Sequence, residues 1–255
     1  MADSNKKIVA VVLVRMGASR FPGKVMKEIL GKPVLGYLLE RVKRSELIND
    51  IVVATSINRE NDVIEEYCNE NDFACFRGSE EDVLGRSLGA LKSVNADVGV
   101  EIFGDGPLID PKIIDHIVQV YLENEDKYDF VSNDLETTYP PGMELEVYSV
   151  KSLEDADKST LDLAIREHGT LFIRQNPNVY RLFNIKAPEE LNFPELEMEL
   201  DTKEDFLVLE NIINNVYVKN SEFTAEDVIC YLMENPEIRQ INQDIPRKWK
   251  EFRNE

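Results

Sequence analysis

The fold is decided by residues 8–24, which read IVAVVLVRMGASRFPGK. Residues 8–14 form a continuous apolar run rich in β-branched side chains, which is typical of a strand buried on both faces of a parallel sheet. The second half is then the loop at the carboxyl end of that strand, where open α/β sheets bind their ligands. This stretch predicts an α/β protein whose ligand site begins at residue 15.

Three cations stand in this loop, Arg15, Arg20 and Lys24, beside Gly17 and Gly23. Glycine lets backbone N–H groups approach a ligand closely, and together such groups form concavities that bind anions. A polyphosphate is the simplest ligand for this combination. The residues alone leave one alternative open, a surface turn whose basic side chains merely offset an acidic chain.

The loop differs from two common phosphate-binding motifs. A P-loop has four residues between its first glycine and its Gly-Lys pair, and a hydroxyl residue for magnesium follows the lysine. Here residues 18–22 separate Gly17 from Gly23, which is one residue too many, and Val25 follows Lys24. The glycine fingerprint of dinucleotide-binding folds is also missing after this strand.

Composition limits the classes of function. The chain has 255 residues, of which 43% are hydrophobic and 31% charged, and its net charge is −20. This length suits one α/β domain with a small appendage. So acidic a protein is not expected to bind nucleic acid or an anionic membrane. An anionic nucleotide would need local cations and a divalent metal, which draws attention to the basic loop.

The cysteines and the hydropathy profile indicate a compartment. Cys68, Cys75 and Cys230 lack metal-ligand spacing and are odd in number, which favours a reducing environment. The sequence shows no signal peptide and no apolar run long enough to span a bilayer. We therefore expect a soluble, cytoplasmic protein.

Strands and helices are expected to alternate along the first half of the chain. The expected strands cover 50–55, 74–77, 98–103 and 129–133, and the expected helices cover 34–44, 61–71, 83–94 and 111–122. This β-α-β rhythm predicts a mostly parallel sheet with helices on both faces. Extended segments are then expected at 144–148 and 179–186, and helices at 166–175, 203–216 and 225–234.

A carboxylate follows the expected strand 98–103, in the segment FGDGPLID at residues 103–110. Asp105 would lie at the same carboxyl edge of the sheet as the basic loop. Magnesium takes one or two carboxylates together with phosphate oxygens, so Asp105 is a candidate ligand. An aspartate in an ordinary Gly-Pro turn is the alternative.

Two further motifs have a structural alternative. Asp201, in LDTKED at 200–205, precedes an expected helix, and on the sequence alone an N-cap role is favoured over metal binding. In FRGSEEDVLGR at 76–86, Ser79 and Asp82 approximate a capping box, which leaves Arg77 and Arg86 unexplained.

The loop at 15–24 resembles the amino-terminal signature of cytidylyltransferases that activate acidic sugars, namely the 3-deoxy-manno-octulosonate and acylneuraminate enzymes and their SpsF-type relatives of spore coat polysaccharide synthesis. Residues 104–108 and 201–205 resemble the family motifs Gly-Asp-x-Pro-Leu and Asp-Thr-x-Glu-Asp. The resemblance covers nearly the whole chain. It implies a mostly parallel, Rossmann-like nucleotide-diphospho-sugar transferase fold of three layers, similar to the GT-A fold.

The resemblance also implies a domain division and a set of site residues. Residues 1–217 would form the nucleotidyltransferase domain, and 218–255 a helical extension that packs on the body or on a partner subunit, with Trp249 in its charged tail. Lys24 and Arg15 would be catalytic, and Asp105 and Asp201 would bind Mg²⁺. The nucleotide would be bound by Arg15, Gly17, Ser19, Arg20, Lys24, Arg77, Ser79 and Arg86. The acceptor would lie near Tyr139, Glu144, Glu146, Arg166 and His168, although His168 also fits a structural role.

The expected reaction is transfer of CMP from CTP to an acidic sugar of the nonulosonic or deoxy-octulosonic type, with release of pyrophosphate, in the synthesis of surface polysaccharide precursors. Such a reaction needs positioning and charge neutralisation rather than a nucleophilic side chain. The preference for CTP, the Mg²⁺ requirement and a homodimer follow from the resemblance. Ala18 departs from the family serine, and the loss of one phosphate hydrogen bond would cost about 1–3 kcal/mol unless Ser19 replaces it.

Two other functions remain open on the sequence. A glycosyltransferase of related fold would need an Asp-x-Asp metal motif after a strand, and the only such triplet, Asp155-Ala156-Asp157, falls in an expected helix. A non-catalytic nucleotide-binding module would bind CTP without releasing pyrophosphate.

Overall fold

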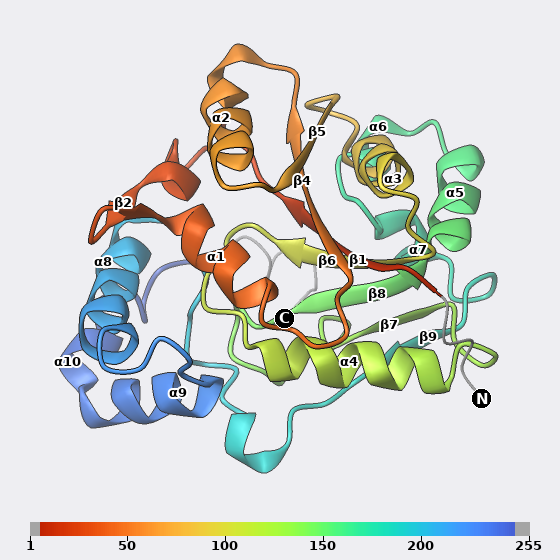
Figure 1. Ribbon diagram of the computed structural model, residues 1–255. Helices are drawn as coiled ribbons and strands as arrows, with labels where there is room; N and C mark the ends of the chain where they lie inside the picture. The colour runs from red at the N-terminus through yellow and green to blue at the C-terminus, as the bar shows by residue number, and fades with distance from the viewer. Residues whose placement is uncertain (1–5, 248–255) are drawn as a thin grey trace.

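The computed structural model describes residues 6–247, which form a seven-stranded, mostly parallel sheet between layers of helices (Figure 1). The strand order is β5-β4-β1-β6-β8-β7-β9. The strands are β1 Ile8–Leu13, β4 Asp50–Ser56, β5 Ala74–Gly78, β6 Val98–Phe103, β7 Phe130–Ser132, β8 Leu145–Ser149 and β9 Leu182–Asn184. A separate short hairpin pairs β2 (Glu28–Ile29) with β3 (Lys32–Pro33).

Strand β1 occupies the middle of the parallel region. It pairs with β4 and β6 in parallel, so that Val11 lies opposite Val52 on one side and Glu101 on the other. Successive side chains of a strand point to opposite faces. Ala10 and Val12 accordingly belong to the core on one face of the sheet, whereas the neighbouring side chains belong to the core on the other face. This double burial is the physical reason for the unbroken apolar run.

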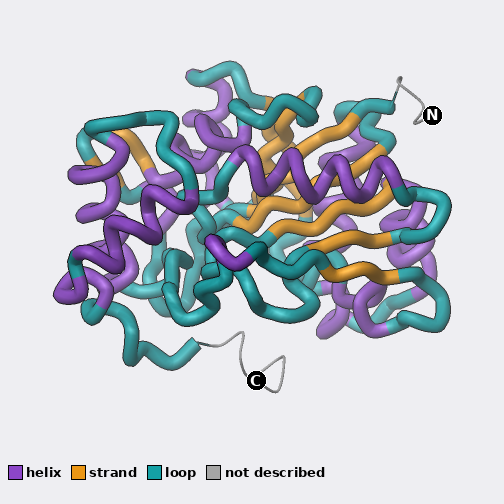
Figure 2. The backbone as a smooth tube through the Cα atoms, turned by 90° about the horizontal axis from the view of Figure 1, so that it is seen from below, coloured by secondary structure: helices purple, strands orange, loops and turns teal. Residues whose placement is uncertain are grey.

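Helices cover both faces of the sheet, which confirms the predicted three-layer arrangement. The larger core receives side chains from α1 (Val34–Val42), α2 (Asp62–Glu70), α4 (Pro111–Glu123), α8 (Lys203–Ile212) and α9 (Ala225–Glu234). The smaller core receives them from α3 (Val83–Ser93), α5 (Val150–Ser159) and α7 (Leu171–Gln175). Seen from below, the long helix α4 crosses the strands (Figure 2).

Strand β8 interrupts the parallel order because it runs antiparallel to both β6 and β7. Strand β9 is parallel to β7 and is shorter than the extended segment expected at 179–186. The helix expected at 166–175 is wrong, since this region forms α6 (Leu163–Arg166) and α7 on either side of Gly169. A side chain at Gly169 would place its Cβ 2.5 Å from Glu101 Oε1, so the break lets the backbone approach the sheet closely.

The second half ends in helices that pack on the body. The expected helix 203–216 becomes α8 followed by a π-helical turn, Ile213–Tyr217. Helix α9 starts where Asp110 Oδ2 accepts a hydrogen bond from Ala225 N at 2.6 Å, and the guanidinium of Arg41 lies 3.8 Å from the centre of the Phe223 ring. A short helix, α10 (Pro236–Arg239), follows.

The domain boundary expected at 217 stays a prediction, and Trp249 lies outside the described residues. Within residues 6–247, no helix combines the length and the apolar character needed to cross a membrane.

Candidate active site

The site forms where the carboxyl ends of β1 and β6 lie side by side, with Leu13 opposite Phe103. The two following loops are joined by a hydrogen bond that Gly104 N donates to Leu13 O at 3.1 Å. A Cβ at Gly104 would stand 2.4 Å from that same oxygen, so this close approach requires glycine. A third segment joins them because Leu200 N donates to Asp105 O at 2.8 Å. Backbone contacts therefore bring three distant segments to one edge of the sheet.

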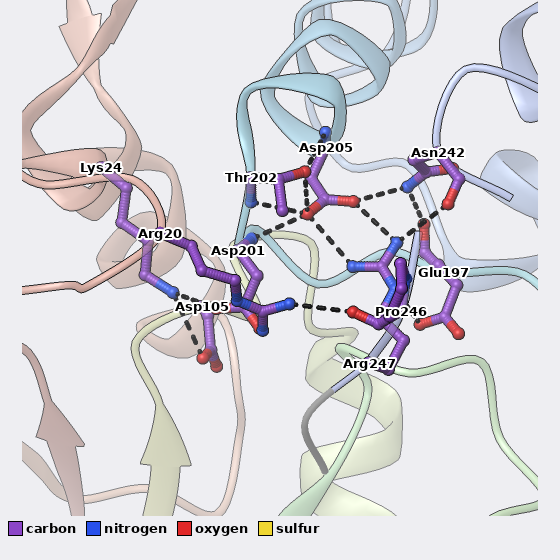
Figure 3. A network of polar contacts seen from close by, with 10 residues as sticks. All are labelled: Arg20, Lys24, Asp105, Glu197, Asp201, Thr202, Asp205, Asn242, Pro246 and Arg247. Atoms are coloured by element: carbon purple, nitrogen blue, oxygen red, sulfur yellow. Dashed lines mark hydrogen bonds and ion pairs between the residues drawn. The ribbon is translucent and has the colours of Figure 1, made fainter. Parts of the chain in front are cut away.

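Lys24, Asp105 and Asp201 meet at this edge (Figure 3). The ammonium of Lys24 lies 2.7 Å from Asp201 Oδ1 and 3.4 Å from Asp105 Oδ2. Lys24 is buried, and burial alone would lower its pKa, but the two carboxylates outweigh burial and raise that pKa. The side chain is therefore a fixed positive charge between two candidate metal ligands.

The other cations of the loop extend from this centre in two directions. Arg20 forms an ion pair with Asp201 and donates from Nη1 to Pro246 O at 3.0 Å. Arg15 forms an ion pair with Glu80 at 2.8 Å.

The two glycines of the loop shape its backbone. Gly23 has a φ of 71°, in the left-handed region that favours glycine, and thus turns the chain into Lys24. Gly17 belongs to the same loop, where a Cβ would stand 3.0 Å from Glu60 Oε1.

The structure overturns the N-cap interpretation of Asp201. Thr202 is the N-cap of α8, and its hydroxyl accepts a hydrogen bond from Asp205 N at 3.3 Å. Asp205 completes a reciprocal capping box by accepting from Thr202 N at 2.7 Å. Because a neighbouring residue caps the helix, the Asp201 carboxylate is directed toward Lys24 instead.

The two aspartates fit a cation that arrives with a nucleotide. Among residues 6–247, no group of three or more His, Cys, Asp or Glu side chains could hold a metal ion. Magnesium commonly binds through one or two carboxylates and completes its octahedral shell with water and substrate phosphates. Asp105 and Asp201 supply such a pair, and the ammonium of Lys24 now lies between them.

Two adjoining cavities open at the site. The first has a volume of about 400 Å³ and is lined by the loop residues Arg15, Ala18, Ser19, Arg20 and Lys24 together with both aspartates. The second, of about 670 Å³, is lined mainly by residues of β6, β8 and the segment 167–175. Both cavities include Leu13, Gly104, Asp105 and His168 in their walls. A nucleotide in the first cavity would thus lie beside a second ligand in the other.

Buried carboxyl groups line the larger cavity. Burial raises the pKa of Glu101 to about 8, helped by the nearby Glu146. Burial also raises the pKa of Glu144 to about 8, although Gly142 N donates to its carboxyl group. Arg174 forms ion pairs with Asp134 at 2.9 Å and with Glu146 at 3.2 Å. Burial thus favours the uncharged form of both groups, in which a carboxyl group can both donate and accept hydrogen bonds.

Some predicted residues lie at these cavities and others do not. Glu144, Glu146 and His168, which were predicted as acceptor residues, all line the larger cavity. The prediction for Tyr139 is corrected, because its side chain is buried in the larger hydrophobic core and not in the wall of the cavity. Arg77 is a second correction. Its guanidinium pairs with Asp62 and Glu65 of α2. Among residues 6–247, it lines neither of these two cavities nor a third one that lies between β5, α3 and α6.

A third cavity, of about 370 Å³, lies between β5, α3 and α6 and shares no lining residue with the other two. Ser79, Arg86 and Arg166 line this third cavity, so Arg166 does not lie with the other predicted acceptor residues. Its guanidinium binds Asp82 at 2.7 Å and Asp157 at 2.6 Å. Only half of the expected capping box is present: Ser79 Oγ accepts from Asp82 N at 3.1 Å, but the N-cap of α3 is Asp82, which accepts from Gly85 N at 2.8 Å.

The Asp-x-Asp triplet has structural partners. Asp157 pairs with Arg166, and Asp155 accepts a hydrogen bond from the Tyr180 hydroxyl at 2.8 Å. Both aspartates lie in α5, away from the carboxyl ends of β1 and β6. The glycosyltransferase interpretation thus loses the motif on which it depended.

Sequence reasoning missed several residues of the larger cavity, among them Glu101, Arg174 and Glu199. Glu101 carried a signal, since a carboxylate interrupts the otherwise apolar strand Val98–Phe103. Glu199 stands out only in the structure, where one of its carboxyl oxygens is buried without a hydrogen-bond partner. Arg174 showed no comparable local signal.

Taken together, the open parallel sheet and the basic loop facing two aspartates at its carboxyl edge define a Rossmann-like α/β protein of the nucleotidyltransferase class. Comparison with known proteins makes the class specific. The family model described as "Cytidylyltransferase" matches residues 9–242, and the chain belongs to this family.

The relatives agree with this assignment. The spore coat polysaccharide biosynthesis protein SpsF of Bacillus subtilis is 32% identical over 238 residues, which cover 90% of this chain and 95% of SpsF. A solved cytidylyltransferase from Leptospira borgpetersenii is 33% identical with a TM-score of 0.87, over 95% of this chain and 100% of that one. A CMP:2-keto-3-deoxy-manno-octonic acid synthetase solved with CTP is 17% identical with a TM-score of 0.58, over 82% of this chain and 98% of that one, and shows the shared fold alone.

Proposed function

We propose that this cytidylyltransferase transfers CMP from CTP to an acidic sugar of the nonulosonic or deoxy-octulosonic type and releases pyrophosphate. The observation that carries the proposal is the meeting of Lys24, Asp105 and Asp201 between two adjoining cavities. Further support comes from membership of the cytidylyltransferase family and from the relative SpsF, which is named for spore coat polysaccharide biosynthesis. The proposal includes Mg²⁺ dependence, a cytoplasmic homodimer and a role in making surface polysaccharide precursors.

In this proposal the smaller cavity holds the triphosphate. Lys24, Arg20 and Arg15 line it and would pair with phosphate oxygens, while backbone N–H groups of the loop approach from Gly17 onward. Asp105 and Asp201 would hold Mg²⁺, which when bound supplies positive charge against the negative charge that develops on the phosphates. Preorganised positive groups of this kind are usually the largest contribution to phosphoryl transfer.

The acceptor would lie in the larger cavity. An acceptor hydroxyl attacks the α-phosphorus, the new oxygen–phosphorus bond forms as the bond to pyrophosphate breaks, and the hydroxyl proton passes to water. The protonated carboxyl groups of Glu101 and Glu144 suit a polyhydroxylated sugar because they both donate and accept hydrogen bonds. Arg174, which lines the same cavity as His168, would face the acceptor's carboxylate.

A pyrophosphate-release screen tests the proposal. The full chain is incubated with CTP, UTP, ATP or GTP against a panel of nonulosonic acids, deoxy-octulosonates and neutral sugar phosphates, with Mg²⁺ or with EDTA. We expect release only with CTP and an acidic sugar, and none in EDTA. Absence of release with every pair, together with measurable CTP binding, would instead favour a non-catalytic nucleotide-binding module. Light scattering that reports a monomer would overturn the homodimer.

A further inference from the structure

Residues 242–247, here called the C-terminal strap, lie against the start of α8 beside the candidate metal aspartates (Figure 3). Asn242 and Arg247 are only 3% and 4% exposed. Arginine and asparagine side chains are seldom buried so deeply unless they are paired or hydrogen-bonded. The partners of these two polar side chains therefore call for a specific explanation.

The strap holds the carboxylate of Asp205, and Arg247 Nε also lies 3.4 Å from Oε2 of a second carboxylate, Glu197. Arg247 donates to Asp205 through two nitrogens, from Nη1 to Oδ2 at 3.1 Å and from Nη2 to Oδ1 at 2.8 Å. Asn242 Nδ2 donates to Asp205 Oδ1 at 2.8 Å and to Glu197 O at 3.0 Å. Bidentate pairs between arginine and a carboxylate are geometrically specific as well as strong. Asp205 therefore has one orientation while the strap is in place.

The same carboxylate holds the backbone that carries Asp201. Asp205 Oδ2 accepts hydrogen bonds from Asp201 N at 3.0 Å and from Thr202 N at 2.7 Å. Of the hydrogen bonds that the Asp205 carboxylate accepts, the capping box requires only the one from Thr202 N. The bond from Asp201 N and the bonds from the strap are additional. The Asp205 carboxylate thus links the strap to the backbone at Asp201 and Thr202.

The strap also reaches the Asp201 side chain by a second route. Pro246 O accepts a hydrogen bond from Arg20 Nη1 at 3.0 Å, and Arg20 forms an ion pair with the Asp201 carboxylate. One connection thus fixes the backbone of Asp201 through Asp205, and the other fixes its carboxylate through Arg20. Both connections end at a residue 2.7 Å from the ammonium of Lys24.

We propose that Arg247 is a positioning residue, which orients Asp201 for the metal–nucleotide complex by holding Asp205. The inference rests on the proposed function, because it assigns a metal ion to Asp201. Partners that orient metal ligands from behind commonly change metal affinity about 10- to 100-fold when they are mutated. A strap that merely stabilised the fold would change unfolding without changing the use of metal.

The test measures CTP binding rather than turnover. The dissociation constant of CTP is determined by calorimetry in excess Mg²⁺ and again in EDTA, and the ratio of the two values is the metal-dependent gain in affinity. For Arg247→Ala we expect this gain to fall about 10- to 100-fold, while affinity in EDTA stays near that of wild type. Arg247→Lys keeps the charge but loses the bidentate geometry, so its gain should be intermediate.

Two further variants keep the result interpretable. Arg181→Ala is the matched control, because it removes a half-exposed ion pair with Asp129 outside the site. Asn242→Ala removes a single donor to Asp205 and serves if Arg247→Ala is unfolded by thermal melting and circular dichroism. A wild-type gain in every folded strap variant would overturn the inference. Failure of the wild-type protein to bind CTP more tightly with Mg²⁺ would instead overturn the proposed metal site.

Discussion

Replacing Lys24 by methionine should change two properties of the protein in opposite directions. Methionine keeps the unbranched, apolar stem but removes the ammonium that lies 2.7 Å from Asp201 and 3.4 Å from Asp105. Without nucleotide, this ammonium competes with a divalent cation for the two carboxylates. With nucleotide, it would pair with a phosphate. The variant should therefore bind a free cation more tightly and yet catalyse more slowly.

The structure sets the scale of both effects. The hydrogen bond from Lys24 to Asp201 is charge-assisted, and such bonds contribute about 1.5–3 kcal/mol. Its loss should raise the affinity of the nucleotide-free protein for a divalent cation about 10- to 100-fold, since about 1.4 kcal/mol corresponds to a factor of ten. Removing one positive group aimed at the developing charge should lower kcat about 10²- to 10³-fold.

Calorimetric titration of Mn²⁺ into nucleotide-free protein measures the first effect, and pyrophosphate release measures the second. Lys186→Met is the matched control, because that lysine is 65% exposed and pairs with Glu136 outside both cavities of the site. Equal Mn²⁺ affinities in wild type and Lys24→Met would refute the competition argument. Near-normal turnover would remove Lys24 from the mechanism.

Three other variants test the remaining arguments. Burial raises the pKa of Glu101 in the folded protein to about 8, from an ordinary value of 4.5, so its contribution to stability is complete below pH 4.5 and is lost as the pH rises through about 8. The stability of Glu101→Gln relative to wild type, measured by urea unfolding, should therefore grow by about 1.4 kcal/mol per pH unit between these two values. A difference in stability that does not change with pH would contradict this. Gly104→Ala, whose Cβ would stand 2.4 Å from Leu13 O, should lower the free energy of unfolding by about 1–3 kcal/mol in the same assay, whereas wild-type stability would disprove the tight contact. Arg77→Ala should leave CTP affinity unchanged by calorimetry and cost about 1–3 kcal/mol of stability, because it breaks partly exposed ion pairs and two hydrogen bonds to Ser56 O and Asn58 O; weaker CTP binding would return Arg77 to the nucleotide site.

The sequence was sufficient for the features that depend on local patterns. The apolar run of β1 predicts its double burial, and the rule that parallel strands present ligands at their carboxyl ends predicts that Lys24 and Asp105 lie at one edge. Asp201 lies far along the chain from both, and only its resemblance to a family motif connected it to them. The N-cap interpretation failed because the next residue, Thr202, caps the helix equally well.

The errors concern side chains whose partners are chosen by tertiary packing. Arg77 and Arg166 are arginines in suggestive motifs, but carboxylates brought near by α2, α3 and α5 bind them. No periodicity of the sequence shows which acidic group an arginine will meet. Arg247 is the converse case, because an arginine in a charged tail segment becomes one of the most buried cations among residues 6–247.

The position of β1 in the middle of the sheet affects how the chain folds while it is being synthesised. Strand β1 is synthesised before both of the strands with which it pairs. Its neighbour β4 is complete at Ser56 and its other neighbour, β6, only at Phe103. The third segment of the site follows near residue 201. One edge of β1 therefore stays unpaired during translation until the residues up to Phe103 have been made. Hence we expect the nascent chain to depend on chaperones that shield β1, and stalled products that stop before Phe103 to aggregate.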